Sequence, residues 1–289
     1  MERRGTPPLF SASAQYRYDR RTTSMRYFGS VFAGLAAISV VVVLIVLGRR
    51  LVSPDRNNRH ACANHLLVVA TALADHRQRT GRFPPAVAAA TDLPFARRLS
   101  WYVQLLPSMR EQELALRFDA TRAWDDPANL APSGTWLEVL HCPARAQTSP
   151  PPPAPVTTYV GIAGIGSRAP LLARNDPKAG VFGYESSARF QDITDGAGTT
   201  MMVIETAKDN GPWAAGGPST VRGLDPAQPY IGSGRQFGGL HSGGAMTAFA
   251  DGSVRFVSDA ISPSTFEALA TIAGHEPVTN LQDVAPVER

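Results

Sequence analysis

Residues 27–48 read YFGSVFAGLAAISVVVVLIVLG, a run of 22 positions without a charged side chain. At 1.5 Å per residue a helix of this length spans roughly 30 Å, the thickness of a bilayer's hydrocarbon core. A secretory signal peptide has a shorter apolar stretch and a small-residue cleavage site, whereas this run closes on Arg49 and Arg50. The sequence therefore predicts one transmembrane helix over residues 27–48.

The basic excess of the chain is confined to the neighbourhood of this segment. Eight of the 28 Lys and Arg residues but only two of the 24 acidic residues lie in residues 1–52, so the remainder carries 20 basic and 22 acidic groups. This near-neutral balance argues against nucleic acid as a partner. The numbers of arginines on the two sides of the predicted span are nearly equal, so the positive-inside rule alone does not decide its orientation. A short basic N-terminal segment and a large near-neutral C-terminal part favour a cytoplasmic tail at 1–26. Residues 49–289 are then expected to be periplasmic or extracellular, anchored to the cell membrane by a single pass.

A second helical pattern follows the apolar run. Cys62, Leu66, Val69 and Leu73 recur at spacings of three and four, which places them on one face of a helix over 55–80. The pattern stops at Gly81, which suits a left-handed helix cap. Residues 27–80 are thus predicted to form a long helix in two halves, the first apolar and the second amphipathic.

The rest of the chain changes character from helix to strand. Residues 81–156 form a mixed region with a helix expected at 100–117, broken at Pro107, and a proline-rich spacer at 150–155. Residues 157–262 hold short strand-like runs, namely TTYVGIAG, ARFQDI, TMMVIETA, AMTAFA and SVRFVSD, with a hairpin turn at 250–253. Residues 208–239 are too rich in Gly and Pro to assign, and a helix and tail occupy 263–289. The expected class is α+β, a long N-terminal helix packed on an antiparallel sheet.

Several segments together resemble a known family. They are CANHLLVVATALADHRQRTGRFPPA, SWYVQLLPSMREQELALRFDATRAWDDPAN, HCPA, TTYVGIAG, FQDITDGAGTTMMVIE and LHSGGAMTAFADGSVRFVSDAIS. In this order they are similar to a pilin-like bacterial family of unknown function labelled fifteen-fifty-nine, also catalogued as a solute-binding-type domain and abundant in planctomycete-type bacteria. The last segment holds the family's C-terminal pattern of a His, nine residues and Asp-Gly, here His241, Asp251 and Gly252. The resemblance implies a membrane helix that runs into a small, pilin-like α+β head.

The chain departs from pilin-like relatives at its N-terminus. Many members carry Gly-Phe-Thr-Leu-x-Glu before the apolar helix, whereas residues 26–33 read RYFGSVFA and the apolar run contains no Glu. In pilins that carboxylate is thought to pair with a neighbouring subunit's amino terminus inside the membrane. The resemblance therefore implies the shape of a pilin more directly than its polymer.

Two cysteines are the first candidate site. Cys62 and Cys142 are the only cysteines in the chain, and in an oxidising compartment they could form a disulfide. The alternative is a pair of buried free thiols.

His241 and Asp251 are the second candidate. A His and a carboxylate can act as an acid–base pair or as metal ligands, but Asp251-Gly252 also suits a hairpin turn and His241 a hydrogen bond to loop backbone. The sequence contains no G-x-S-x-G, H-E-x-x-H or Walker-type motif. The structural interpretation is preferred, and no enzymatic activity is expected.

Two further candidates concern ligands. Asp192 and Asp195 could contribute to a Ca²⁺ site, although their spacing matches no complete calcium loop. Trp213, in a Gly- and Pro-rich stretch, could expose its ring to a sugar or a protein. No other cofactor is expected.

These observations favour a membrane-anchored pilin- or pseudopilin-like component of a surface or type II secretion-like assembly, without catalysis. Its expected partners are membrane lipid and copies of itself or other pilin-like proteins. The alternative is an anchored protein that binds a solute or polysaccharide through residues 208–239.

Overall fold

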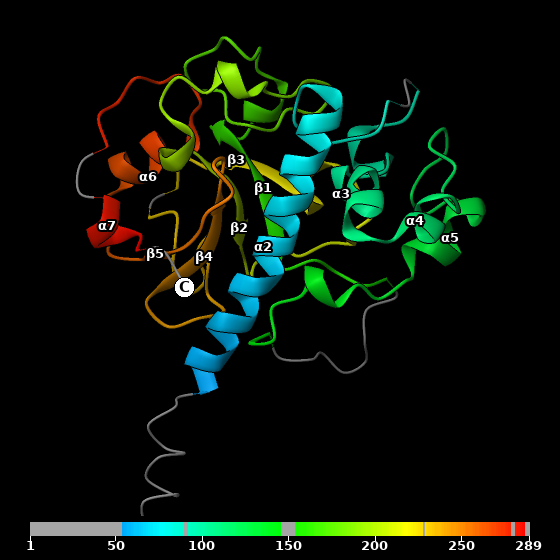
Figure 1. Cartoon of the computed structure of the whole chain (residues 1–289), viewed down its shortest axis with the longest axis horizontal. Helices are drawn as coiled ribbons and strands as arrows, with labels where there is room; N and C mark the ends of the chain where they lie inside the picture. Colours follow the sequence, from blue (N-terminus) through cyan, green and yellow to red (C-terminus); the bar gives the residue numbers. More distant parts are fainter. Residues whose placement is uncertain (1–53, 90–91, 146–153, 228, 279–280, 287–289) are drawn as a thin grey trace, which may run out of the picture. The chain divides into compact units, whose positions relative to one another are not determined.

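A five-stranded sheet lies at the centre of the described part of the chain (Figure 1). The computed structural model describes residues 54–89, 92–145, 154–227, 229–278 and 281–286, and the residues from Pro54 onward form one compact unit. The strands lie in the order β3-β1-β2-β4-β5, and their bounds are β1 (Tyr159–Ile165), β2 (Met201–Glu205), β3 (Val221–Leu224), β4 (Gly244–Phe249) and β5 (Val254–Ser258). The chain thus has a mixed α+β fold.

The sheet is not wholly antiparallel, as the sequence had suggested. Strand β3 pairs in parallel with β1, while the other three neighbouring pairs are antiparallel. Strand β3 falls within residues 208–239. The many Gly and Pro residues there prevented its four residues from being recognised as a strand in the sequence. The chain therefore crosses β1 after leaving β2 and adds β3 at the far edge of the sheet.

Both faces of the sheet are buried. Val160 and Ile162 point into an apolar cluster with Phe266 of α6 (Pro263–Ala270), whereas Tyr159 belongs to a second cluster with Leu66 of α2 (Pro54–Thr80). Because helices cover both faces, the strands consist mostly of continuous apolar residues and do not alternate between apolar and polar residues.

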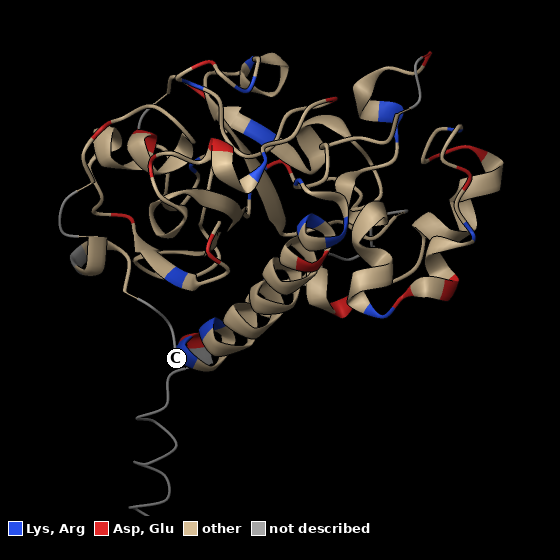
Figure 2. Ribbon diagram, turned by 45° about the horizontal axis from the view of Figure 1, so that its top comes forward, with Lys and Arg blue, Asp and Glu red and all other residues tan. Residues whose placement is uncertain are grey.

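Helix α2 covers one face, where it packs against β4 and β5. Its inward residues Cys62, Leu66, Val69 and Leu73 are fully buried, which confirms the amphipathic pattern. Gly81 ends the helix with a φ of +82° and donates its N–H to the Arg77 carbonyl. Figure 2 shows charged residues at the two ends of α2 and none over its middle turns.

The remaining helices are short. The helix expected at 100–117 is split into α3 (Trp101–Leu105), the 3₁₀ turn η2 (Leu106–Met109) and α4 (Gln112–Ala115), because Pro107 interrupts the pattern and Arg110 has a φ of +67°. The run ARFQDI, expected as a strand, forms the 3₁₀ turn η5 (Phe190–Asp192), since Asp192 accepts hydrogen bonds from Arg189 and closes a turn. The other elements are α5 (Pro127–Ser133), α7 (Leu281–Val284), η1 (Phe95–Arg97), η3 (Glu138–Leu140), η4 (Ala169–Leu171), η6 (Ala197–Thr199) and η7 (Gly217–Ser219).

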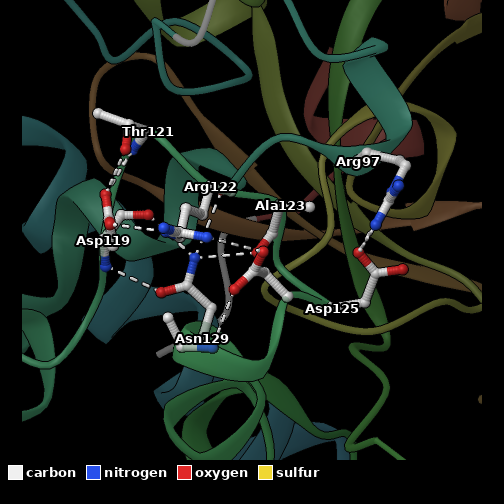
Figure 3. A network of polar contacts seen from close by, with 9 residues as sticks. Arg97, Asp119, Thr121, Arg122, Ala123, Asp125 and Asn129 are labelled. Carbon is white, nitrogen blue, oxygen red and sulfur yellow. Dashed lines mark hydrogen bonds and ion pairs between the residues drawn. The ribbon is translucent and has the colours of Figure 1, made fainter.

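The segment between α4 and α5 is held by one buried amide, seen in Figure 3. Asn129 is fully buried, and its Oδ1 accepts the Asp119 N–H at 2.8 Å while its Nδ2 donates to the Asp119 and Ala123 carbonyls at 2.9 Å each. An ion pair of 2.8 Å between Arg97 and Asp125 ties the same segment to η1. A loop without regular structure is fixed in this way.

The predicted transmembrane helix at 27–48 and the basic tail at 1–26 lie outside the described residues. Within the described ranges, no helix combines the length and the apolar character needed to cross a membrane.

Candidate functional site

Four polar or sulfur-bearing side chains from distant parts of the sequence meet between α2 and the sheet. The first two, Cys62 of α2 and Cys142 after η3, form a disulfide with a Cα–Cα distance of 5.3 Å. The predicted pairing is therefore confirmed, and the alternative of two free thiols does not describe this structure. Cys142 is held in place because its N–H donates to the Thr158 hydroxyl at 2.7 Å.

His241 is the third member and points its ring at the disulfide. It lies just before β4, in a turn where Gly243 adopts a φ of +85°. Its Nε2 lies 3.2 Å from the Cys62 sulfur and 3.3 Å from the Cys142 sulfur, and its Nδ1 lies 2.9 Å from Asp55 Oδ1. Because an ionised carboxylate only accepts hydrogen bonds, Asp55 assigns the proton to Nδ1 in the neutral ring.

Asp55 lies in the first turn of α2, where it also pairs with Arg59 at 3.0 Å. Partial burial acts to raise the pKa of Asp55, but the hydrogen bond with His241 and the charge of Arg59 outweigh it. The pKa of Asp55 therefore lies below its usual value, and the group stays ionised as a partner for His241.

Glu205 is the fourth member and the most unusual. It ends β2 with its side chain fully buried, and Oε2 lies 3.5 Å from His241 Nε2. Neither carboxylate oxygen meets hydrogen-bonding geometry with a donor among the described residues. Burial raises the pKa of Glu205 to about 8, with a smaller contribution from Asp55, while the Met246 amide and Arg59 partly offset the rise. The phenol of Tyr159, on the neighbouring strand, is also buried without a hydrogen-bonding partner in this part of the structure.

The ligating atoms of Cys62, Cys142, Glu205 and His241 all lie within 4.8 Å of one another. We call these four residues the sulfur–histidine cluster. Thiolate, imidazole and carboxylate are the ligand types that zinc takes in proteins, so these residues could hold a metal if the sulfurs were reduced.

The other predicted partner of His241 lies elsewhere. Asp251 follows β4 and His241 precedes it, so the length of the strand separates them. Asp251 instead accepts hydrogen bonds from the Ser253 N–H and hydroxyl, and Gly252 has a φ of +86°. The hairpin-turn interpretation of Asp251-Gly252 is confirmed, and a His241–Asp251 pair does not form.

The two candidate calcium ligands have other partners. Asp192 makes an ion pair of 2.7 Å with Arg189, which holds the pKa of the carboxyl below its usual value through the hydrogen bond. Asp195 accepts the N–H groups of Gly274 and His275 at 2.7 and 3.0 Å. Both carboxylates thus secure loops, and Asp195 fixes the chain after α6.

The expectation that Trp213 exposes its ring is wrong. Its side chain is fully buried, and its indole N–H donates to the Thr135 carbonyl at 3.0 Å. The Gly- and Pro-rich context suggested exposure, but the ring packs into the core at an edge-on contact with Phe118. An exposed ring face for a ligand is therefore not available at this position.

Most of the described chain, including this cluster, matches a known protein family. The family described as Protein of unknown function (DUF1559) matches residues 56–229 and 225–264, which together cover more than half of the 289 residues. The chain belongs to this family. All four residues of the sulfur–histidine cluster fall within the DUF1559 match, and Asp55 lies one position before it. No curated protein and no solved structure matches the chain.

Sequence analysis missed the way in which Asp55 and Glu205 join the cluster. The sequence does not single out Glu205 as a site residue, and it marks residue 55 only as the start of the predicted helix. One signal was present, because Glu205 is a charged residue at the end of the apolar strand MMVIE. An ionisable group in such a strand is rarely buried without a partner.

Proposed function

We propose that this DUF1559 protein is a single-pass membrane protein whose extracytoplasmic unit serves as a pilin- or pseudopilin-like structural subunit, with no catalytic activity. Its family is one of unknown function, so the proposal depends on the chain itself. The observation that carries it is the way in which the start of α2 is tied to the rest of the unit.

Three links fasten the first turns of α2. Asp55 contacts His241, and Cys62 is bonded to Cys142. Between them, Arg59 donates to the Ser242 carbonyl and lies 4.0 Å from the centre of the Phe256 ring. These links occur at positions four and three residues apart, so they lie along one side of the helix.

The position of these links supports a role for α2 as the connection between a membrane anchor and the folded unit. The apolar residues 27–48 precede α2 closely in the sequence, so any force on an embedded segment would reach the unit through residues 54–62. A covalent bond and two charged contacts at this end would resist separation of the helix from the sheet.

The outward face of α2 supports contacts between copies. Leu67 and Val68 are 50% and 44% exposed on a helix whose other apolar residues are largely covered. Two neighbouring apolar side chains on an otherwise polar stripe would suit helix-to-helix packing in an assembly.

Site-specific photocrosslinking of the full chain in intact membranes tests this proposal. A crosslinker at Leu67 or Val68 should give dimers of the chain or adducts with pilin-like proteins. The matched control is Leu171, which is similarly exposed at 53% but lies in η4. Absence of protein adducts at 67 and 68, or equal yields at all three positions, would contradict an assembly through α2.

A second candidate function is supported by a cavity. A hollow of about 560 Å³ is lined by Tyr184, Lys208, Arg222, Asp225, Arg235 and Gln236, among others, most of them from residues 208–239. Charged and amide groups around one aromatic ring suit a polar solute or an acidic polysaccharide. Calorimetric titration with uronic-acid oligosaccharides tests this role, and binding that is lost in Arg235→Ala would favour it over a purely structural one.

A further inference from the structure

The sulfur–histidine cluster has the composition of a metal centre. Cys62 comes from α2, Cys142 from the segment after η3, Glu205 from β2 and His241 from the turn before β4, and all four are buried. Their convergence on one point requires the whole fold, since Cys62 and His241 are separated by 179 positions. The proposed structural role uses the contact between His241 and Asp55, but it does not require a buried Glu205 beside the disulfide.

The carboxyl group of Glu205 is buried without a well-formed hydrogen bond among the described residues. A buried polar atom without a partner costs free energy, and native proteins rarely leave one. Neither oxygen of Glu205 meets hydrogen-bonding geometry with a donor among the described residues, and the polar groups near them include the Met246 amide and His241 Nε2, which is 3.5 Å from Oε2. A cation at the centre would satisfy them.

The orientation of the His241 ring also favours a bound cation. With its Nδ1 proton shared with Asp55, its Nε2 directs a lone pair toward both sulfurs and Glu205 Oε2, at 3.2, 3.3 and 3.5 Å. The imidazole, the two sulfurs and the carboxyl group therefore direct potential ligand atoms toward one point. A carboxylate behind the distal nitrogen of a metal-binding His is a recurrent arrangement, because it fixes the tautomer and raises the basicity of the ligand.

The distances suit a tetrahedral ion. In a zinc site with Zn–S of about 2.3 Å and Zn–N of about 2.0 Å, neighbouring ligand atoms lie roughly 3.3–3.8 Å apart. The distances from His241 Nε2 to the two sulfurs and to Glu205 are close to this range. The two sulfurs are too close together, because they are bonded to each other.

We propose that the dithiol form of the chain binds one zinc-class divalent ion through Cys62, Cys142, His241 and Glu205. The disulfide is the oxidised, metal-free state of the same site. A dithiol reductant transfers two electrons and two protons to the disulfide and becomes a disulfide itself, and the ion then displaces the two thiol protons to solvent. With four protein ligands the site is closed, so the ion stabilises the junction of α2 with the sheet and does not act on a substrate.

Cobalt provides the direct test. The full chain in detergent is reduced with a dithiol, desalted without oxygen, assayed for two free thiols and titrated with Co²⁺. We expect a thiolate-to-cobalt charge-transfer band and tetrahedral d–d bands that saturate at one ion per chain, and Zn²⁺ should abolish them. The oxidised chain should show neither band. A reduced chain with two free thiols and no such bands would overturn the proposal.

Variants assign the ligands. Glu205→Gln and His241→Gln should each weaken Co²⁺ binding, and Asp55→Asn should weaken it by roughly 10–100-fold as a positioning residue. The control His275→Gln, at a residue with 74% side-chain exposure, should bind as the wild type does. Equal affinity in all four variants would place the ion elsewhere and refute the assignment.

Zinc-edge X-ray absorption of the wild type covers the case in which a variant fails to fold. A shell of two sulfurs with two nitrogen or oxygen atoms is the expected result, and a shell without sulfur contradicts the site. If reduction unfolds the metal-free chain, recovery of its tryptophan emission by Zn²⁺ but not by Mg²⁺ supports the proposal, and no recovery opposes it. These results are independent of whether copies of the chain crosslink through α2.

Discussion

Replacement of Glu205 by Gln should change how the stability of the disulfide form depends on pH. Burial raises the pKa of Glu205 from 4.5 to about 8 in the folded chain. Below pH 4.5 the carboxyl is protonated in both the folded and the unfolded state, so it imposes no penalty. As the pH rises toward 8 the unfolded state loses this proton first, and folding stability falls until the folded carboxyl has also ionised.

The expected magnitude follows from this pKa difference of about 3.5. One pKa unit corresponds to about 1.4 kcal/mol, so the full penalty above pH 8 is about 5 kcal/mol, of which about 4 kcal/mol develops between pH 5 and pH 9. For a unit of this size that loss corresponds to a decrease in Tm of about 10 °C. The amide introduced by Glu205→Gln cannot ionise, so this component should be missing from the variant.

The assay is thermal unfolding of the full chain in mild detergent, followed by tryptophan fluorescence at pH 5, 7 and 9 with a chelator present. The wild type should lose about 4 kcal/mol more stability than Glu205→Gln over this range. Glu113→Gln, at an exposed position, should retain the wild-type profile. If Glu205→Gln and the wild type show parallel profiles, the raised pKa of Glu205 and the reasoning from its burial are wrong.

Other substitutions test the packing. Replacement of both Cys62 and Cys142 by Ser removes a link across 80 positions and should lower the free energy of unfolding by about 4.5 kcal/mol in oxidising buffer, measured by denaturant titration; no loss would mean that the link does not constrain the unfolded chain. Asn129→Ala removes three hydrogen bonds between the buried amide and the backbone and should cost about 3 kcal/mol in the same titration, whereas a loss below about 1 kcal/mol would contradict the role given to this amide. Gly164→Ala places a Cβ atom 2.0 Å from a backbone oxygen and should prevent folding, while Gly166→Ala, with a similar φ but open space, should cost only about 1 kcal/mol; equal effects on soluble yield and Tm would refute the steric argument.

Local patterns in the sequence predict much of the fold. Helix α2 follows from the spacing of Cys62, Leu66, Val69 and Leu73, which a single helical period explains. The β4–β5 hairpin follows from an Asp-Gly turn between two apolar runs. Strand β3 could not be found in this way, because four residues among glycines and prolines carry too little periodic signal. Its parallel pairing depends on where the chain crosses β1, which is a property of the whole fold.

The candidate site was only partly predictable. The two cysteines could be paired because the chain has no others, and His241 stood out through the family pattern. The partner of His241 is Asp55, 186 positions away, and no spacing rule connects them. Glu205 reaches the cluster through the register of β2 with its neighbours. Trp213 shows the opposite error, since a Gly- and Pro-rich context suggested exposure for a ring that the core encloses.

Alkaline extraction combined with protease access in spheroplasts, in which only the cytoplasmic membrane remains closed, tests most directly whether the chain is anchored in the membrane with its large unit outside the cytoplasm. The full chain should remain in the membrane pellet after carbonate treatment, and external protease should remove an epitope at the C-terminus while one at the N-terminus survives. A chain released by carbonate, or a C-terminal epitope that is protected until the spheroplasts are lysed, would contradict the account.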